Sequence, residues 1–118
     1  MLKILLADDD FSMVGLLKTL LDMEGYQVVT LLDKPGDILE NIRSAKPDIL
    51  LIDIYLGDRN GLDIVRQLRK MPDLDGIRII MASGIDKSEE CLAAGADDFL
   101  LKPYMPNELF DKLRSLRS

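Results

Sequence analysis

The run Ile49-Leu50-Leu51-Ile52 is apolar at every position and is followed directly by Asp53. Four further runs share this short pattern, one interrupted only by Thr30 and one only by Arg78: Ile4 to Ala7, Val28 to Leu32, Ile77 to Ala82 and Phe99 to Leu101. Strands that are apolar at consecutive positions are covered on both faces, which is typical of a parallel sheet between layers of helices. The sequence therefore predicts five strands of such a sheet.

The segments between these runs carry apolar residues at helical spacing. The repeats are Met13, Leu16, Leu17, Leu20 and Leu21; Ile38 and Ile42; Leu62, Val65 and Leu68; and Leu109, Leu113 and Leu116. Asp10 or Ser12 is placed to cap the first helix, Gly25 to end it, and Gly95 to end a short fourth helix. Strands and helices thus alternate with short connections, which predicts one doubly wound α/β domain over residues 1–118, a sheet with five helices.

The composition excludes several kinds of chemistry. With 118 residues, of which 47% are hydrophobic, the chain suits a single domain with a core. Lys and Arg number 15 against 21 Asp and Glu, a net charge of -6, so we expect no direct binding to nucleic acid. Because there is no His, Ser-His or Cys-His nucleophiles and histidine metal ligands are excluded. The single cysteine, Cys91, is interpreted as a packing residue.

The apolar stretches are too short for a membrane span or a signal peptide. The first run stops at Asp8, and no stretch approaches the roughly 18 apolar residues that a spanning helix needs. A single cysteine also fits a reducing compartment. We therefore expect a cytoplasmic protein without a membrane partner.

Polar residues gather where the predicted strands end. Asp8, Asp9 and Asp10 follow the first strand, Asp53 the third, Ser83 the fourth, and Lys102 with Pro103 the fifth. In a doubly wound domain the carboxyl ends of the strands form the ligand-binding edge. Carboxylates gathered there repel one another by roughly 4 kcal/mol per pair at 4 Å. We expect Lys102 to neutralise one charge and a hard divalent cation, Mg²⁺ or alternatively Mn²⁺, to neutralise the rest.

This set of residues also suits phosphoryl transfer to an aspartate. A carboxylate is already ionised at neutral pH and needs no base to attack phosphorus. A metal ion, the Ser83 hydroxyl and the Lys102 ammonium could each stabilise one phosphoryl oxygen. Asp53 is the expected acceptor, because it stands in the middle of the proposed edge.

Five ordered motifs resemble the receiver domain of two-component response regulators, including those of the chemotaxis-regulator kind. They are Ile4-Leu-Leu-Ala-Asp-Asp-Asp10, Pro47-Asp-Ile-Leu-Leu-Ile-Asp53, the Asn60-Gly61 turn, Met81-Ala-Ser83-Gly84 and Ala93-Ala-Gly-Ala-Asp-Asp-Phe-Leu-Leu-Lys-Pro103. The resemblance spans essentially the whole chain. It implies a flavodoxin-like three-layer sandwich with the strand order 2-1-3-4-5.

The resemblance also implies a role for each site residue. Asp53 would be phosphorylated, Asp9 would bind Mg²⁺ directly, and Asp8 would bind it mostly through water. The backbone carbonyl of Tyr55 would complete the protein's metal ligands. Ser83 and Lys102 would each bind a phosphoryl oxygen, Lys102 would pair with Asp53 beforehand, and the Lys102-Pro103 bond would be cis. Phe99 would be the switch aromatic.

The function implied by the resemblance is that of a phosphorylation-operated switch. A histidine kinase or a histidine phosphotransfer protein would donate the phosphoryl group. The added charge would then alter a surface made by the fourth helix, fifth strand and fifth helix, which would bind an effector domain or protein or form a phosphorylation-dependent homodimer. The chain would catalyse only its own phosphorylation and dephosphorylation, and so would not be an enzyme in the usual sense.

Three features depart from the family pattern. The segment from Ser83 to Lys102 is about three residues short, close to one helical turn, so we expect a stubby or reoriented fourth helix. Gly57 stands where many relatives have Pro, which predicts a looser loop after Asp53. The bulky Tyr55 and Ile85 flank the expected path of attacking water, which predicts slow loss of the phosphoryl group.

Other interpretations remain open at this stage. The three aspartates that begin at Asp8 could form a helix-capping cluster, and Asp53 a turn. The chain could be a receiver-like scaffold that binds partners without phosphorylation. An aspartyl-phosphate hydrolase would need a second Asp at position 55, which is Tyr. A flavin carrier would need a phosphate loop where the three aspartates stand.

Overall fold

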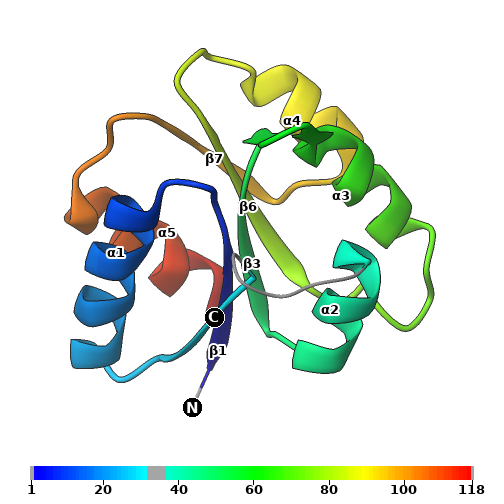
Figure 1. Cartoon of the computed structure of the whole chain (residues 1–118). Coiled ribbons are helices and arrows are strands. Elements are labelled where there is room, and N and C mark those ends of the chain that lie inside the picture. Colours follow the sequence, from blue (N-terminus) through cyan, green and yellow to red (C-terminus); the bar gives the residue numbers. More distant parts are fainter. Residues whose placement is uncertain (1, 32–36, 118) are drawn as a thin grey trace.

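The chain folds around one parallel sheet of five strands (Figure 1). The computed structural model describes residues 2–31 and 37–117. The strands are β1 (Lys3–Ala7), β2 (Gln27–Thr30), β3 (Ile49–Asp53), β6 (Arg78–Ser83) and β7 (Asp98–Leu101), in the order β2-β1-β3-β6-β7 with every pairing parallel. This is the flavodoxin-like order 2-1-3-4-5 that the family resemblance implies.

Five helices cover the two faces of the sheet. They are α1 (Phe11–Met23), α2 (Ile38–Ala45), α3 (Gly61–Arg69), α4 (Ser88–Ala94) and α5 (Pro106–Arg117). In Figure 1, α1 and α5 lie on one face, and α2, α3 and α4 lie on the other. No helix in the described part of the chain is both long enough and apolar enough to cross a membrane.

Two separate cores explain why the strands are apolar at consecutive positions. In β1, Ile4 and Leu6 pack toward α1 and α5, in a cluster with Leu17 and Leu113. Leu5, by contrast, belongs to the cluster under α2, α3 and α4. Because alternate side chains of a strand point to opposite faces, a sheet with two buried faces needs an apolar residue at every position.

The strand boundaries differ from the predicted runs by one or two residues, including β1, which begins at Lys3, and β3, which includes Asp53. The structure ends β2 at Thr30, while the run Val28 to Leu32 predicts a longer strand; residue 32 lies outside the described residues. β6 is shifted by one residue, since Arg78 pairs with β3 and Ser83 remains within the strand. β7 begins one residue earlier than predicted, at Asp98, which pairs with β6 despite its charge.

A short hairpin after β3 was missed by the sequence patterns. β4 (Tyr55–Leu56) and β5 (Arg59–Asn60) pair antiparallel. Strands of two residues are too short to carry an alternating pattern, so periodicity cannot detect them. Asn60, expected in a turn with Gly61, is also the N-cap of α3, where its side chain accepts a hydrogen bond from the backbone of Leu62.

The helix ends follow the predicted punctuation. Asp10 caps α1 by accepting a hydrogen bond from the Met13 backbone at 3.1 Å, so only this one of the three aspartates acts as a helix cap. Gly25 has a φ of 92°, and Gly95, which ends α4, has a φ of 119°; both values suit glycine. α4 has seven residues and is the shortest of the five helices described above, as expected from the short segment that contains it.

Candidate functional site

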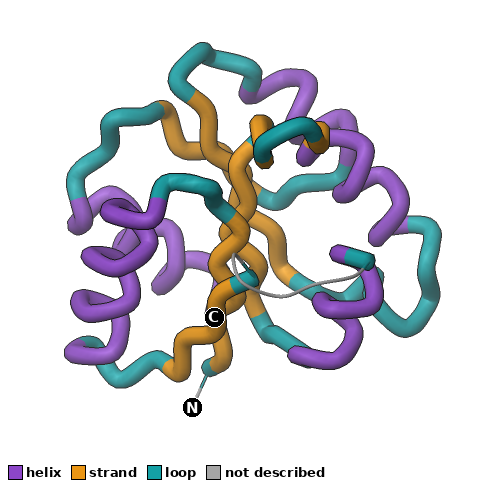
Figure 2. Tube along the Cα trace, viewed as in Figure 1, coloured by secondary structure: helices purple, strands orange, loops and turns teal. Residues whose placement is uncertain are grey.

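Four strand ends converge at one edge of the sheet. Asp8 and Asp9 follow β1, Asp53 and Ser83 end β3 and β6, and Lys102 follows β7. The registers of the parallel pairs place these ends side by side, with Asp53 opposite Ala82 and Ser83 opposite Leu101. The loops that leave these strands lie along the upper part of Figure 2. The structure therefore brings the predicted polar residues together.

Asp8, Asp9 and Asp53 form an acidic cluster. One carboxylate oxygen from each residue lies within 4.8 Å of the others. Asp8 and Asp53 are only 9% exposed, whereas Asp9 is exposed. At that separation two carboxylates repel by about 3.5 kcal/mol for an effective dielectric of about 20. The cluster therefore needs positive charge.

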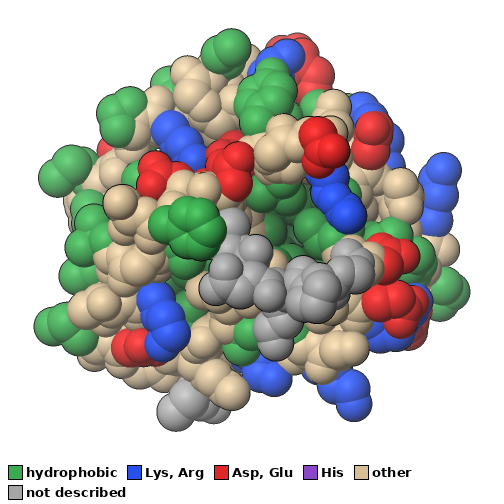
Figure 3. Space-filling model, in the orientation of Figure 1, with side chains coloured by type: hydrophobic (Ala, Val, Ile, Leu, Met, Phe, Trp, Pro, Cys, Tyr) green, Lys and Arg blue, Asp and Glu red, His purple; other side chains and the backbone are tan. Residues whose placement is uncertain are grey.

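The ammonium of Lys102 supplies part of this charge by bridging two of the carboxylates. Its Nζ donates to Asp53 Oδ2 at 2.7 Å and to Asp8 Oδ2 at 2.8 Å. A single ammonium offsets one negative charge in total, which Lys102 shares between the two oxygens, so the cluster of three carboxylates still needs further positive charge. Figure 3 shows acidic side chains grouped beside a basic one on the upper left of the visible face.

Burial and ion pairing act in opposite directions on these groups. Burial raises the pKa of the Asp53 carboxyl above its ordinary value, and the hydrogen bond from Lys102 opposes that rise. Burial lowers the pKa of Lys102, but the hydrogen bonds to Asp53 and Asp8 outweigh it, so the pKa of the ammonium rises overall. Lys102 therefore stays charged across the physiological pH range.

Backbone N–H groups hold the cluster from the other side. Asp10 N donates to Asp8 Oδ1 at 3.0 Å, and Gly57 N donates to Asp9 Oδ2 at 3.0 Å. A longer contact of 3.4 Å joins Tyr55 N to Asp53 Oδ1. Gly57 thus ties the loop after β3 to the cluster through an N–H that a proline would lack.

The other predicted residues surround the cluster. Ser83 is fully buried, and its Oγ accepts a hydrogen bond from Ile85 N at 3.2 Å. Tyr55 and Ile85 are 51% and 62% exposed. Phe99 is half-buried against the core under α2, α3 and α4, away from the carboxylates, and the Lys102-Pro103 bond is cis.

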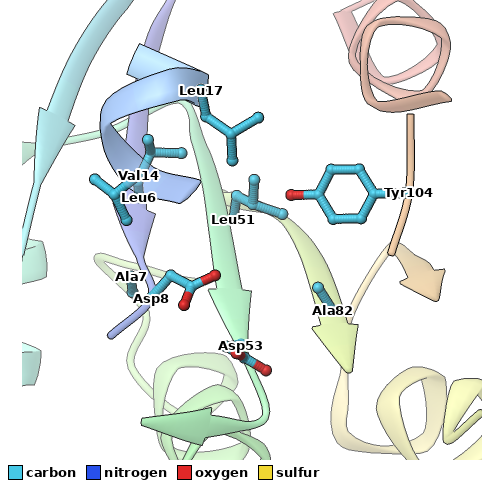
Figure 4. Close-up of a pocket in the computed structure, with 9 residues that line it drawn as sticks. All are labelled: Leu6, Ala7, Asp8, Val14, Leu17, Leu51, Asp53, Ala82 and Tyr104. Atoms are coloured by element: carbon cyan, nitrogen blue, oxygen red, sulfur yellow. The ribbon is translucent and has the colours of Figure 1, made fainter. Parts of the chain in front are cut away.

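Two residues near the cluster were not singled out as site residues from the sequence. Gly61 packs so closely under β3 that a Cβ atom would come within 2.3 Å of the Asp53 carbonyl oxygen. In the sequence, the only indication of a special role for Gly61 is that it follows Asn60 in an Asn-Gly pair. Tyr104 lines a small cavity together with Asp8 and Asp53 (Figure 4), and its signal is an aromatic residue directly after Lys102-Pro103.

The acidic cluster could hold a metal ion. Its donors are carboxylate oxygens only, which suit a hard divalent cation and not a soft one. Two of the carboxylates are almost fully buried, so positive charge from a cation would relieve a repulsion that water screens poorly. The residues present therefore fit a hard cation.

Comparison with known proteins agrees with this architecture. A family model described as the response regulator receiver domain matches residues 4–114. The chain is 37% identical over 115 residues to the transcriptional regulatory protein CpxR of Klebsiella pneumoniae, covering 97% of this chain and 48% of CpxR. It is 33% identical over 116 residues to the DNA-binding response regulator MtrA of Mycolicibacterium paratuberculosis, covering 96% of this chain and 50% of MtrA.

Solved structures show the same fold. The chemotaxis response regulator CheY4 of Vibrio cholerae superimposes with a TM-score of 0.85 at 26% identity, covering 98% of both chains. A signal receiver domain from Bermanella marisrubri gives a TM-score of 0.86 at 29% identity, again covering 98% of both chains. The chain spans about half the length of the curated relatives that it matches. It belongs to the response regulator receiver domain family, whose standard function is phosphorylation-activated signalling in two-component systems.

Proposed function

We propose that Asp53 accepts a phosphoryl group from a phosphohistidine carried by a histidine kinase or a histidine phosphotransfer protein, with Mg²⁺ or Mn²⁺ bound at the acidic cluster. The observation that carries the proposal is the Lys102 ammonium, which lies 2.7 Å from an Asp53 oxygen at a mostly carboxylate-lined strand edge. A donor of this kind implies a cytoplasmic location for the chain.

Asp53 acts as the nucleophile. One of its oxygens forms a bond to phosphorus while the bond from phosphorus to the donor's imidazole nitrogen breaks, and that electron pair remains on nitrogen. The ammonium of Lys102 stabilises the ionised, attacking form of the carboxylate against the effect of burial. No general base is required, because the nucleophile carries no proton.

Asp8, Asp9 and Asp53, with the backbone carbonyl of Tyr55, would hold the cation. When bound, Mg²⁺ supplies positive charge to the phosphoryl oxygens during transfer. Asp10 N and Gly57 N orient the carboxylates of Asp8 and Asp9. A carboxylate can accept several hydrogen bonds at once, so these contacts leave free lone pairs for a metal ion or its water molecules.

Ser83 and Lys102 are placed to stabilise the phosphoryl group after transfer. The Ser83 oxygen already accepts a hydrogen bond from Ile85 N, and this leaves the hydroxyl proton free to be donated to a phosphoryl oxygen. Lys102 can exchange its contact with Asp8 for another phosphoryl oxygen while remaining near Asp53. The Ser83 hydroxyl and the Lys102 ammonium would then both donate hydrogen bonds to the negatively charged phosphoryl group.

An apolar rim around the cluster suits a protein donor. Four exposed apolar side chains each follow a site residue closely in the chain: Phe11, Tyr55, Ile85 and Met105, which are 51% to 68% exposed. Exposed aromatic and aliphatic residues grouped around a polar centre are typical of a protein interface. We propose that this rim contacts the surface of the protein that carries the phosphohistidine.

The output surface is proposed to include α4, β7 and α5. Leu92 and Leu101 are about half exposed on α4 and β7. Phe99 also lies on β7, where it is half-buried and pairs with Met81 of β6. A change in the position of Phe99 on phosphorylation would act by packing, because Phe has no hydroxyl. Binding of an effector domain or protein, or a phosphorylation-dependent homodimer, would follow.

Incubation with acetyl phosphate tests the phosphorylation site. With Mg²⁺ present, intact-mass measurement should reveal the addition of one phosphoryl group, which Asp53→Asn abolishes and EDTA prevents. Asp10→Asn is the matched control: it also removes one carboxylate near the cluster, and Asn caps a helix as well as Asp does. If the wild-type protein remains unmodified, or if Asp53→Asn still forms the adduct, the proposal is wrong.

A further inference from the structure

A small, partly open cavity lies behind the acidic cluster. Its apolar walls come from β1, α1, β3 and β6, and its polar groups are Asp8, Asp53 and the hydroxyl of Tyr104. Figure 4 shows the Tyr104 hydroxyl directed into the cavity and the Asp8 carboxylate turned toward its interior, while the Asp53 carboxylate points away from it. The cavity therefore lies between the hydrophobic core under α1 and α5 and the inner side of the cluster.

The Tyr104 hydroxyl has no protein partner within residues 2–31 and 37–117, where no atom forms a hydrogen bond with it. Tyr104 is only 8% exposed, but its hydroxyl oxygen is not completely enclosed by protein atoms, which leaves it accessible to a water molecule. Burial raises the pKa of Tyr104 to about 12, so the hydroxyl keeps its proton and can donate it. A hydroxyl that the protein leaves without a partner can be satisfied by an ordered water molecule.

The cavity has the size and the chemistry for one water molecule. It leaves about 10 Å³ for the centre of a water molecule, close to the space that a single ordered water requires. Such a water also needs at least two polar partners. The Tyr104 hydroxyl can donate to it, and the Asp8 carboxylate can accept from it, because a carboxylate has lone pairs beyond those used by Asp10 N and Lys102.

We propose that this cavity binds one ordered water molecule that bridges the Tyr104 hydroxyl and the Asp8 carboxylate, which makes Tyr104 a positioning residue for the acidic cluster. The bridge holds Asp8 from the core side, opposite its contacts with Lys102 and Asp10 N. Its effect on metal binding rests on the proposed function, since it assumes that the cluster binds Mg²⁺. The water site itself does not depend on that assumption.

Tyr104→Phe removes the hydroxyl and keeps the ring. Partners that orient metal ligands typically change metal affinity by 10- to 100-fold, and a water-mediated link should do less. We expect the Kd for Mg²⁺, measured by calorimetric titration, to rise about 3- to 10-fold in Tyr104→Phe. Tyr26→Phe is the matched control, because Tyr26 is equally buried in the same core cluster but does not line this cavity. Its Kd should stay at the wild-type value.

A crystal structure of the wild-type protein at high resolution supplies a second readout. We expect density for one water within hydrogen-bonding distance of the Tyr104 hydroxyl and the Asp8 carboxylate, and its loss in Tyr104→Phe. An empty cavity overturns the inference, as does a wild-type Kd in Tyr104→Phe or an equal rise in Tyr26→Phe. If the wild-type protein binds no Mg²⁺, the proposed function fails instead, and the density at Tyr104 still decides whether the water site exists.

Discussion

Replacing Lys102 with Met leaves two buried carboxylates without their cation. The side chains of Lys102, Asp8 and Asp53 are only 20%, 12% and 11% exposed, so water cannot replace the ammonium efficiently. Met keeps most of the aliphatic length of Lys and isolates the loss of charge. We expect Lys102→Met to fold but to be less stable than the wild-type protein at neutral pH in EDTA.

The expected loss of free energy of unfolding is about 3 kcal/mol. Removing one partner of a buried ion pair costs about 3–5 kcal/mol, and the partial exposure of Lys102 favours the lower end. The remaining repulsion between the carboxylates, about 3.5 kcal/mol at 4.8 Å, is of similar size. Protonation of one carboxyl group would remove most of it.

The loss should therefore shrink on acidification. Burial already raises the pKa of Asp53 in the folded protein, and without Lys102 that pKa rises further. A carboxyl whose pKa is higher in the folded than in the unfolded state binds protons preferentially when folded, so its unfavourable contribution disappears as the pH falls through the folded-state pKa. Lys102→Met should therefore approach the stability of the wild-type protein as the pH falls from neutral to acidic values, through the folded-state pKa of Asp53.

Mg²⁺ should rescue the variant at neutral pH, because Lys102 no longer competes for the carboxylates. A tenfold gain in affinity corresponds to about 1.4 kcal/mol of additional stabilisation at saturating Mg²⁺. Urea unfolding followed by circular dichroism, at neutral and at acidic pH and with Mg²⁺ or EDTA, measures these effects. Lys112→Met is the control. It removes an ammonium whose Nζ lies 2.9 Å from Asp98 Oδ1, in a side chain that is 32% exposed and far from the cluster. Equal losses at both pH values, together with equal effects of Mg²⁺ on variant and wild type, would refute the reasoning.

Three further substitutions test other parts of the site and its support. Gly61→Ala should destabilise the fold by more than about 1 kcal/mol and slow phosphorylation of Asp53, because the new Cβ would come within 2.3 Å of the Asp53 carbonyl oxygen. Gly15→Ala is the control: the space around Gly15 is open, so its free energy of unfolding in urea should rise by about 0.5–1 kcal/mol. Arg69→Met should lower the free energy of unfolding by about 2–4 kcal/mol, because the Arg69 guanidinium donates hydrogen bonds to three backbone carbonyls and one carboxylate, those of Gly95, Asp75, Ile77 and Asp97. Arg66→Met is the control, since it removes only an exposed ion pair with Asp63 and should change stability little. Tyr55→Ala and Ile85→Ala should each shorten the lifetime of the phosphorylated protein, followed by intact mass, and an unchanged lifetime in both would remove the proposed shielding from water.

The sheet and the positions of the site residues could be predicted from the sequence because both depend on local patterns. A strand with two buried faces must be apolar at consecutive positions, so each run marked a strand and the residue after it marked the edge. Asp53 and Lys102 could be placed at that edge without knowledge of any contact. The topology then brings the ends together, as the registers of β3, β6 and β7 confirm.

Contacts that depend on three-dimensional distance could not be predicted. The double contact of Lys102 requires Asp8 and Asp53, which are 45 residues apart, to present oxygens to one ammonium. In the sequence, Gly57 predicts only a loose loop, whereas in the structure its N–H donates a hydrogen bond to Asp9 Oδ2. In the sequence, Tyr104 after Lys102-Pro103 cannot be told from an ordinary core residue. The cavity at its hydroxyl exists only because of how α1 packs against the sheet.

The position of β7 explains how chemistry at the cluster can affect the surface. Lys102 N donates to the Ser83 carbonyl at 2.8 Å, so the two residues proposed to bind phosphoryl oxygens are joined through the backbone of adjacent strands. β7 is also one of the two edge strands of the sheet, and Phe99 lies on it three residues before Lys102. Because an edge strand is paired on one side only, it can shift with fewer broken hydrogen bonds than β3 or β6. A phosphoryl group that attracts Lys102 and Ser83 together would therefore act on the strand that is best placed to move, and Phe99 would move with it.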